Sequence, residues 1–346
     1  MFDDKYSDAI ITIMQKQINF KNYYYPLILL VIVVVLFVTN FKPGTWLLGW
    51  DNLQSELNFS LNLSRNFFAG WQEYQGLGLA SGHAHTVEFV RLITYFWLFL
   101  LSPSLLTRYL FHFLMLFLGS LFVYKLCKDD LFESMQNKEK FSFVASLLYL
   151  LSLGTMQNFY VPLEAYSVFY AFFPLTTLYL LKFIKFGGKK NLLLYSIANL
   201  LIIPSFHIQT YFIVLVICLF LPLGVYALAK KNYFKRYVVL LFTLVIVNLF
   251  WLFNVLYFVL NNVTVRLSSH INRFASTDNF LKNVQFGNYY DVFLLRGFWF
   301  QNIDYLGKTN GFSYMLSNWI AWYGNKFNSN FIQYFCICFG RIVSAV

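Results

Sequence analysis

The sequence predicts an all-α, polytopic membrane protein. Of its 346 residues, 59% are hydrophobic and only 12% are charged, whereas about 25% of the residues of a soluble domain are charged. The apolar residues form long continuous runs instead of alternating with polar ones, which favours membrane-spanning helices over a β-barrel. Lys and Arg are concentrated in short segments between these runs, and this distribution predicts the topology.

Two short basic segments fix the expected orientation. Segments 182–190 and 230–236 together contain eight Lys or Arg and no acidic residue, so both are expected in the cytoplasm. Residues 191–229 between them carry no charge over 39 positions, about twice the length of one span. Pro204 and the polar residues that follow it predict a turn, and therefore a helical hairpin whose tip faces outward.

The remaining spans follow from these two anchors. They are expected at 26–41, 105–126, 141–157, 166–183 and 237–260, which makes about seven spans with a cytoplasmic N-terminus in the plasma (inner) membrane. Segment 92–101 is apolar but too short to span, and it would break the inside–outside alternation, so an interfacial or re-entrant helix is expected there.

The predicted organisation has three parts. Residues 1–260 form a membrane module with a large first extracytoplasmic loop at 42–104, residues 261–330 form a polar extracytoplasmic segment, and residues 331–346 form an incomplete last span. The net charge of +11 is explained by the topology, so no nucleic-acid partner is expected. The four cysteines are expected to be buried free thiols, and they are Cys127, Cys218, Cys336 and Cys338.

The first outer loop contains the candidate catalytic acids. Apolar and polar residues recur at helical spacing over 51–72, which predicts an amphipathic helix on the membrane surface. Asp51 begins its polar stripe. With Gln54 it would form a capping box, and the same carboxylate could also face a cavity. Glu56 lies on the flank between the two stripes, where a solvated interfacial acid is the simple interpretation.

The same loop and the helix ends beside it contain the candidate binding residues. His83 and His85, with Glu88, could ligate a divalent cation or could be ordinary loop histidines. Arg65 and Arg91 are placed to hold an anionic headgroup, whereas Arg108 begins a span and is expected to snorkel to the surface. Two further polar residues are expected at the same outer surface, and they are Glu164 and His207.

A retained first span followed by an outer loop that opens with Gly49-Trp50-Asp51 resembles the GT-C glycosyltransferases. The nearest patterns are those of the cell-wall arabinofuranosyltransferases and the YfhO-like membrane proteins. The Gly-rich stretch at 76–82, the helix that ends at Ser102-Pro103, and His112 in the next span are also similar. The resemblance extends over residues 20–260, and because members of this family are longer, it implies an N-terminal fragment.

The resemblance implies a specific reaction. A sugar would pass from a polyprenyl-phosphate donor to a cell-envelope glycan or protein acceptor, with Asp51 at the family's catalytic position and Glu56 as a second candidate. The chemistry is compatible, because one carboxylate can act as the base and Arg65 or Arg91 can offset charge on the departing phosphate. The alternatives are a transporter or flippase for lipid-linked glycans and a non-catalytic membrane assembly protein.

The topology predicts which positions a membrane-impermeant maleimide can reach in intact cells. A cysteine introduced as Lys42→Cys should react from outside, whereas Lys190→Cys should react only after permeabilisation. The unsubstituted chain gives the background from its own cysteines. The opposite labelling pattern would contradict the assigned orientation.

Overall fold

In the computed structural model, the chain forms two compact units, residues 1–265 and 266–346. The structure describes residues 20–47, 58–68, 70–72, 79–80, 87, 89–102, 104–160 and 163–268, together with 281, 284, 289–293, 295, 303–305 and 312–314. The first unit is a helical bundle, and the second is described by itself below.

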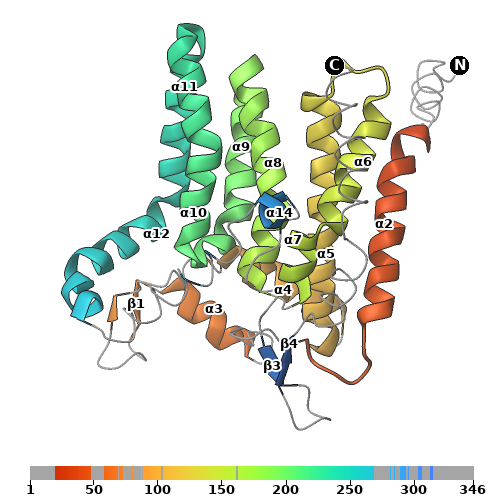
Figure 1. Cartoon of the computed structure of the whole chain (residues 1–346). Coiled ribbons are helices and arrows are strands. Elements are labelled where there is room, and N and C mark those ends of the chain that lie inside the picture. The colour runs from red at the N-terminus through yellow and green to blue at the C-terminus, as the bar shows by residue number, and fades with distance from the viewer. Residues whose placement is uncertain are drawn as a thin grey trace, which may run out of the picture. The chain divides into compact units, whose positions relative to one another are not determined.

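The helices of the bundle run alongside one another in alternating directions (Figure 1). They are α2 (Phe20–Asn40), α5 (Ser104–Leu126), α6 (Lys138–Leu151), α8 (Glu164–Phe186), α9 (Lys189–Ile202), α10 (Gln209–Leu215), α11 (Leu221–Ala229) and α12 (Phe234–Ser268). A π-helical turn, η5 (Val216–Phe220), joins α10 to α11 without ending the helix. A second π-helical turn, η3 (Cys127–Leu131), follows α5.

Five of these helical segments are long and apolar enough to cross a membrane, so the prediction of a multi-pass membrane protein is confirmed at that level. They are Tyr23–Asn40, Leu105–Leu131, Glu164–Phe186, Gln209–Ala229 and Lys231–Asn261. The two other predicted spans are present as α6 and α9, each of 14 residues, which is shorter than the roughly 20 residues of a complete span. After Ser152, α6 is followed by α7 (Leu153–Tyr160).

The turns between these helices have clear local causes. Pro204 lies in η4 (Ile203–His207), a 3₁₀ segment between α9 and α10, as expected for a residue that cannot continue an α-helix. Gly187 and Gly188 have φ of +68° and +87° between α8 and α9, a conformation that glycine adopts without strain. Arg236 of α12 donates through Nη1 to the carbonyls of Ile184 and Lys185, both at 2.7 Å, and so satisfies carbonyl groups at the end of α8.

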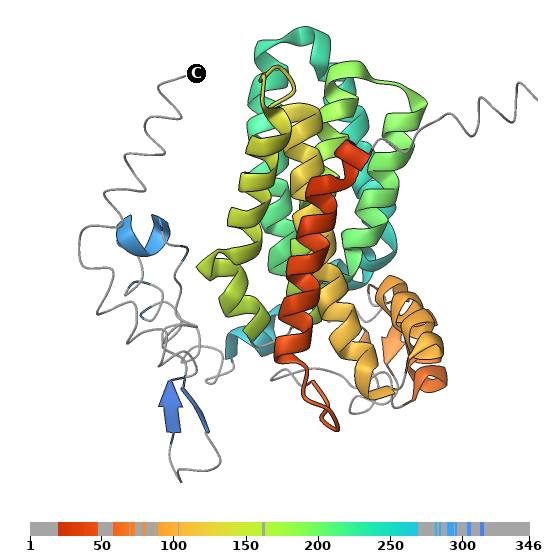
Figure 2. The same ribbon diagram turned by 90° about the vertical axis from the view of Figure 1, so that its right-hand side faces the viewer.

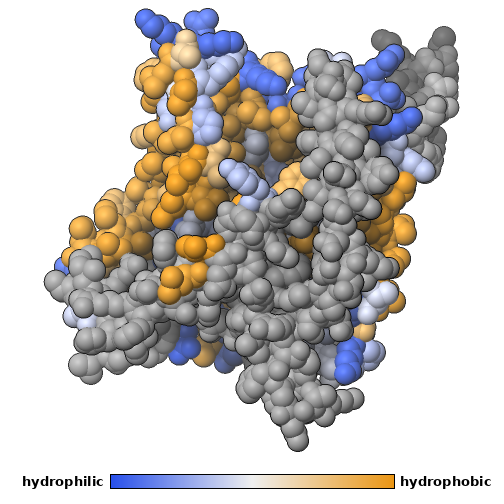
Figure 3. Space-filling view, viewed as in Figure 1, coloured by the Kyte–Doolittle hydropathy of each residue, from blue (hydrophilic) through white to orange (hydrophobic). Residues whose placement is uncertain are grey.

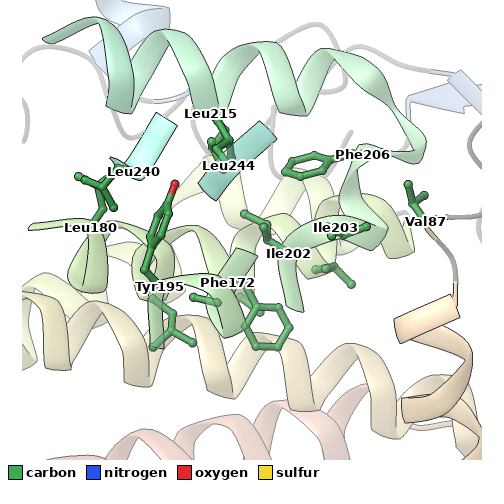
Figure 4. Packing of buried hydrophobic residues seen from close by; sticks show 14 of the residues in the cluster. Val87, Phe172, Leu180, Tyr195, Ile202, Ile203, Phe206, Leu215, Leu240 and Leu244 are labelled. Carbon is green, nitrogen blue, oxygen red and sulfur yellow. The ribbon is translucent and has the colours of Figure 1, made fainter. Parts of the chain in front are cut away.

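The hydrophobic core lies around α8. Buried residues make up 61% of the α8 span but only 11% of the α2 span, so α8 is central and α2 lies on the outer flank (Figure 2). Residues of α8, α9, α10 and α12 interdigitate in the core (Figure 4). Large apolar side chains also remain exposed along the sides of the bundle, between its charged ends (Figure 3), as lipid-facing surfaces require.

Helices α5 and α8 approach closely where Gly119 meets Tyr170. A Cβ atom at Gly119 would collide with the ring of Tyr170. The Tyr170 ring is itself held, because it stacks on Tyr149 with ring centroids 4.3 Å apart. The small residue therefore allows the two helices to pack closely.

The outer-loop prediction is partly wrong. The described helix here, α3, spans Phe59–Phe67, and its N-cap is Asn58, whose Oδ1 accepts a hydrogen bond from the Leu61 amide at 3.1 Å. The predicted helix continued to residue 72, but Trp71–Gln72 is a strand, β1, paired antiparallel with β2 (Leu79–Ala80). The apolar residues keep a helical spacing beyond Gly70, which is why the predicted helix was too long. Glycine is a poor helix former and favours a chain reversal at this point.

The short apolar segment does form a separate helix, α4 (Phe89–Leu101). It buries Arg91, Leu92 and Tyr95 and exposes Trp97 and Leu101. Helices α3 and α4 lie together at one end of the bundle (Figures 1 and 2), and Phe59 of α3 packs against aromatic residues of α4.

Helix α12 continues to Ser268, while the apolar span that it belongs to ends at Asn261, where the polar segment was predicted to begin. One further expectation needs correction. Cys127 is a buried free thiol as predicted, whereas Cys218, in η5, is free but exposed. Cys336, Cys338 and segment 331–346 lie outside the described residues.

The second unit contains little described structure. It includes a short helix, α14 (Tyr289–Phe293), and an antiparallel pair of strands, β3 (Ile303–Tyr305) and β4 (Phe312–Tyr314). With β1 and β2, these very short strands are the β structure found within the described residues, so the fold is essentially all-helical.

The close contact at Gly119 predicts an unusual mutational result. In an unobstructed helix, Gly→Ala raises stability by about 1 kcal/mol, but Gly119→Ala should lower it by about 1–3 kcal/mol through overpacking. Thermal unfolding in detergent measures the change. A double-mutant cycle with Tyr170→Leu should show coupling between the two positions, and a stabilised Gly119→Ala protein would contradict the close approach.

Candidate functional site

Three helices bring charged side chains together at the α3–α4 end of the bundle. Arg91 belongs to α4, Arg108 lies in the first two turns of α5, and Glu164 is the first residue of α8. All three are buried, with exposed fractions of 5%, 0% and 6%. Because isolated buried charges are costly, their close grouping indicates that each depends on the others.

A single carboxylate oxygen joins the three helices. Oε1 of Glu164 forms an ion pair with Nη1 of Arg108 and a second, at 3.4 Å, with Nη1 of Arg91. The hydroxyl of Tyr95 donates to the same oxygen at 3.4 Å. We call Arg91, Tyr95, Arg108 and Glu164 the arginine–glutamate cluster.

Tyr95 also supports both guanidinium groups. Its ring centroid lies 5.3 Å from Cζ of Arg91 and 5.9 Å from Cζ of Arg108, within the range of cation–π attraction. The ring stacks in turn on Phe111 of α5, with centroids 4.5 Å apart. The guanidinium groups are therefore oriented by an aromatic side chain that is itself packed in the core.

Within the arginine–glutamate cluster, two guanidinium groups share the carboxylate of Glu164, and all three side chains are removed from water. Glu164 lies in the first turn of α8, where the helix dipole favours a negative charge. The carboxylate therefore lies between two guanidinium groups and the N-terminal end of α8.

A second polar pair lies one turn deeper along the same two helices. His112 follows Arg108 by four residues and Ser167 follows Glu164 by three, so each pair shares one face of its helix. Nδ1 of His112 lies 2.7 Å from Oγ of Ser167, which also donates to the Leu163 carbonyl at 3.1 Å. Because Ser167 has one hydroxyl hydrogen for these two contacts, the tautomer of His112 decides which atom donates in the His112–Ser167 pair.

The structure brings two of the predicted binding residues into direct contact, Arg91 and Glu164. Arg65 lies in the last turn of α3, the helix that packs against α4. His207 ends η4, which contacts both α4 and α8. These four residues therefore occupy elements at the same end of the bundle.

The other candidates cannot be placed. Asp51, Glu56, His83 and His85 all lie outside the described residues, as does Glu88 of the predicted cation site. Among the residues that the structure does describe, no group of three His, Cys, Asp or Glu could hold a metal ion.

Arg108 is where the sequence interpretation was wrong. It was expected to snorkel toward the membrane surface, but it is completely buried and paired with Glu164. The position of an arginine at the start of a span is compatible with both outcomes, and here a carboxylate on a neighbouring helix decided between them. Tyr95 was also missed, although its i, i+4 spacing from Arg91 places both on one face of α4.

The fold and the arginine–glutamate cluster define a multi-pass helical membrane protein with a buried charged site at one end of its bundle. Comparisons of the chain with protein-family models, curated proteins and solved structures found no match.

Glu164→Gln should destabilise the bundle strongly. Removing the shared carboxylate takes away a counter-charge from two buried guanidinium groups, a loss of about 3–5 kcal/mol in the free energy of unfolding. Thermal unfolding in detergent would measure it. The control is Glu139→Gln, which breaks a partly exposed pair with Lys128 and should cost about 0–1 kcal/mol.

The triple substitution Arg91→Met, Arg108→Met and Glu164→Met removes all three charges together and should recover much of the lost stability. If the Glu164→Gln protein melted at the same temperature as the Glu139→Gln protein, the carboxylate of Glu164 would not be the group that holds the three helices together.

Proposed function

We propose that this protein is a membrane glycosyltransferase of the GT-C type, which transfers a sugar from a polyprenyl-phosphate donor on the extracytoplasmic face. The observation that carries the proposal is the arginine–glutamate cluster, a buried site at one end of a membrane bundle in which two arginines lie side by side. The anions that a membrane contains at the depth of this site are the phosphates of its lipids.

The orientation follows from the distribution of basic residues. The opposite end of the bundle carries the two short segments rich in Lys, 182–190 and 230–236, and it faces the cytoplasm. The arginine–glutamate cluster then faces outward. Helices α3 and α4 lie beside the headgroups at that end, and their exposed apolar side chains, among them Phe67 and Trp97, enter the lipid.

Within the cluster, the two arginines have different roles. Arg108 is fully buried and forms the closer ion pair with Glu164, so it holds the carboxylate and the helices in place. Arg91 pairs with the same oxygen at 3.4 Å, and a planar guanidinium with five N–H donors is the side chain best suited to hold a phosphate. Arg91 thereby stabilises the negative charge that grows on the departing polyprenyl phosphate.

The base of the reaction is Asp51, with Glu56 as the second candidate. The carboxylate takes the proton of an acceptor hydroxyl, whose oxygen bonds to the anomeric carbon of the sugar while the bond from that carbon to the phosphate oxygen breaks. Glu164 is unsuited to this role, because its Oε1 is already shared between two guanidinium groups and the Tyr95 hydroxyl.

The reaction is tested in membranes supplied with a radiolabelled polyprenyl-phosphate sugar. Asp51→Asn should lower transfer at least about 100-fold by removing the base, and Arg91→Gln should lower it about 100-fold by removing a donor to the phosphate. The matched control is Asp129→Asn, an exposed aspartate whose partner is Lys182, and it should leave transfer unchanged.

Two outcomes would contradict the proposal. Full transfer by the Asp51→Asn protein would exclude this residue as the base. If the unsubstituted protein made no product while a lipid-linked glycan still crossed the bilayer, the protein would be a transporter instead.

A further inference from the structure

The end of the bundle opposite the arginine–glutamate cluster presents a continuous surface of exposed lysines. Two turns form it, the one between α8 and α9 and the one between α11 and α12. Arg236 joins them, because it donates to two carbonyls at the end of α8 and its guanidinium lies against Gly187. The exposed lysines of both turns, here called the lysine surface, are Lys189, Lys190, Lys230, Lys231 and Lys235.

Three acidic residues at this end of the bundle already pair with other lysines. Asp130 pairs with Lys185 at 2.8 Å, Asp129 with Lys182 at 3.3 Å, and Glu139 with Lys128 at 2.7 Å. All three pairs involve the segment that follows α5. Within the described part of the chain, no residue of the lysine surface takes part in an ion pair, so no described carboxylate neutralises these lysines directly.

The lysine surface adjoins the apolar sides of the same helices. Phe186 at the end of α8, Leu193 in α9 and Leu228 in α11 are 65%, 60% and 68% exposed. Each lies within a turn of the lysines. In a bilayer these apolar residues require acyl chains, so the lysines above them stand at the level of the headgroups. The hydrophilic turns at this end and the apolar band beneath them are visible in Figure 3.

We propose that the lysine surface binds the phosphates of acidic phospholipids and thereby links the α11–α12 turn to the α8–α9 turn. An anionic headgroup supplies the negative charge that no described carboxylate brings to these lysines, and juxtamembrane lysine clusters gain affinity from such lipids. Both turns contribute, since each carries part of the charge and Arg236 keeps them adjacent. This inference does not depend on the proposed glycosyltransferase activity.

The test measures the binding of acyl-chain-labelled phosphatidylglycerol to the purified protein in neutral detergent, with labelled phosphatidylcholine as the reference lipid. Changing all five lysines to Gln should weaken phosphatidylglycerol binding by about tenfold or more and leave phosphatidylcholine binding unchanged. Changing all five to Arg keeps the charge and should keep the binding. Two half-variants each change the lysines of one turn. The first carries Lys189→Gln and Lys190→Gln, and the second carries Lys230→Gln, Lys231→Gln and Lys235→Gln. Each should show a partial loss of phosphatidylglycerol binding.

A matched control removes charge from the same end but outside the lysine surface, through Lys125→Gln, Lys138→Gln and Lys140→Gln. An equal loss of binding in this control would show that net charge alone matters and would overturn the proposal. Unchanged phosphatidylglycerol binding after five Lys→Gln changes would overturn it too. So would binding of inorganic pyrophosphate with no binding of phosphatidylglycerol. Melting curves in neutral detergent establish whether each variant is folded. If the variant with all five Lys→Gln changes does not fold, the binding measured for the two half-variants decides the test.

Discussion

The carboxylate of Glu164 is the constraint on which the α3–α4 end of the bundle depends. Two buried guanidinium groups can remain together only if a negative charge lies between them, and Glu164 supplies it from the first turn of α8. This contact fixes α4 and α5 relative to the central helix. The close approach of α5 and α8 at Gly119 then continues the same interface toward the opposite end.

The two ends of the bundle use charge in different ways. At the arginine–glutamate cluster, the charges are buried and few, so each interaction is strong and depends on the geometry of its neighbours. At the lysine surface, the charges are exposed and numerous, and solvent screens them. The proposed recognition of a phosphate relies on the first arrangement, whereas the proposed binding of acidic phospholipids relies on the second.

Particular residues show how far the sequence could lead. The turn at Pro204 and the helix boundary near Lys189 were predicted well, because proline chemistry and clusters of charge act locally. The helix proposed for 51–72 was too long at its C-terminal end, because hydrophobic spacing does not register the chain reversal that follows Gly70. Arg91 and Glu164 were both selected as outer polar residues, but their direct contact could not be derived from positions 73 residues apart.

The sequence by itself determined that the chain is a multi-pass helical membrane protein and which of its ends is basic. These properties depend on the length of apolar runs and the count of charges between them, which need no knowledge of contacts. The tertiary structure alone decided that Arg108 is buried rather than at the surface. Whether an arginine snorkels or is enclosed depends on what a neighbouring helix places opposite it, and here that is the carboxylate of Glu164.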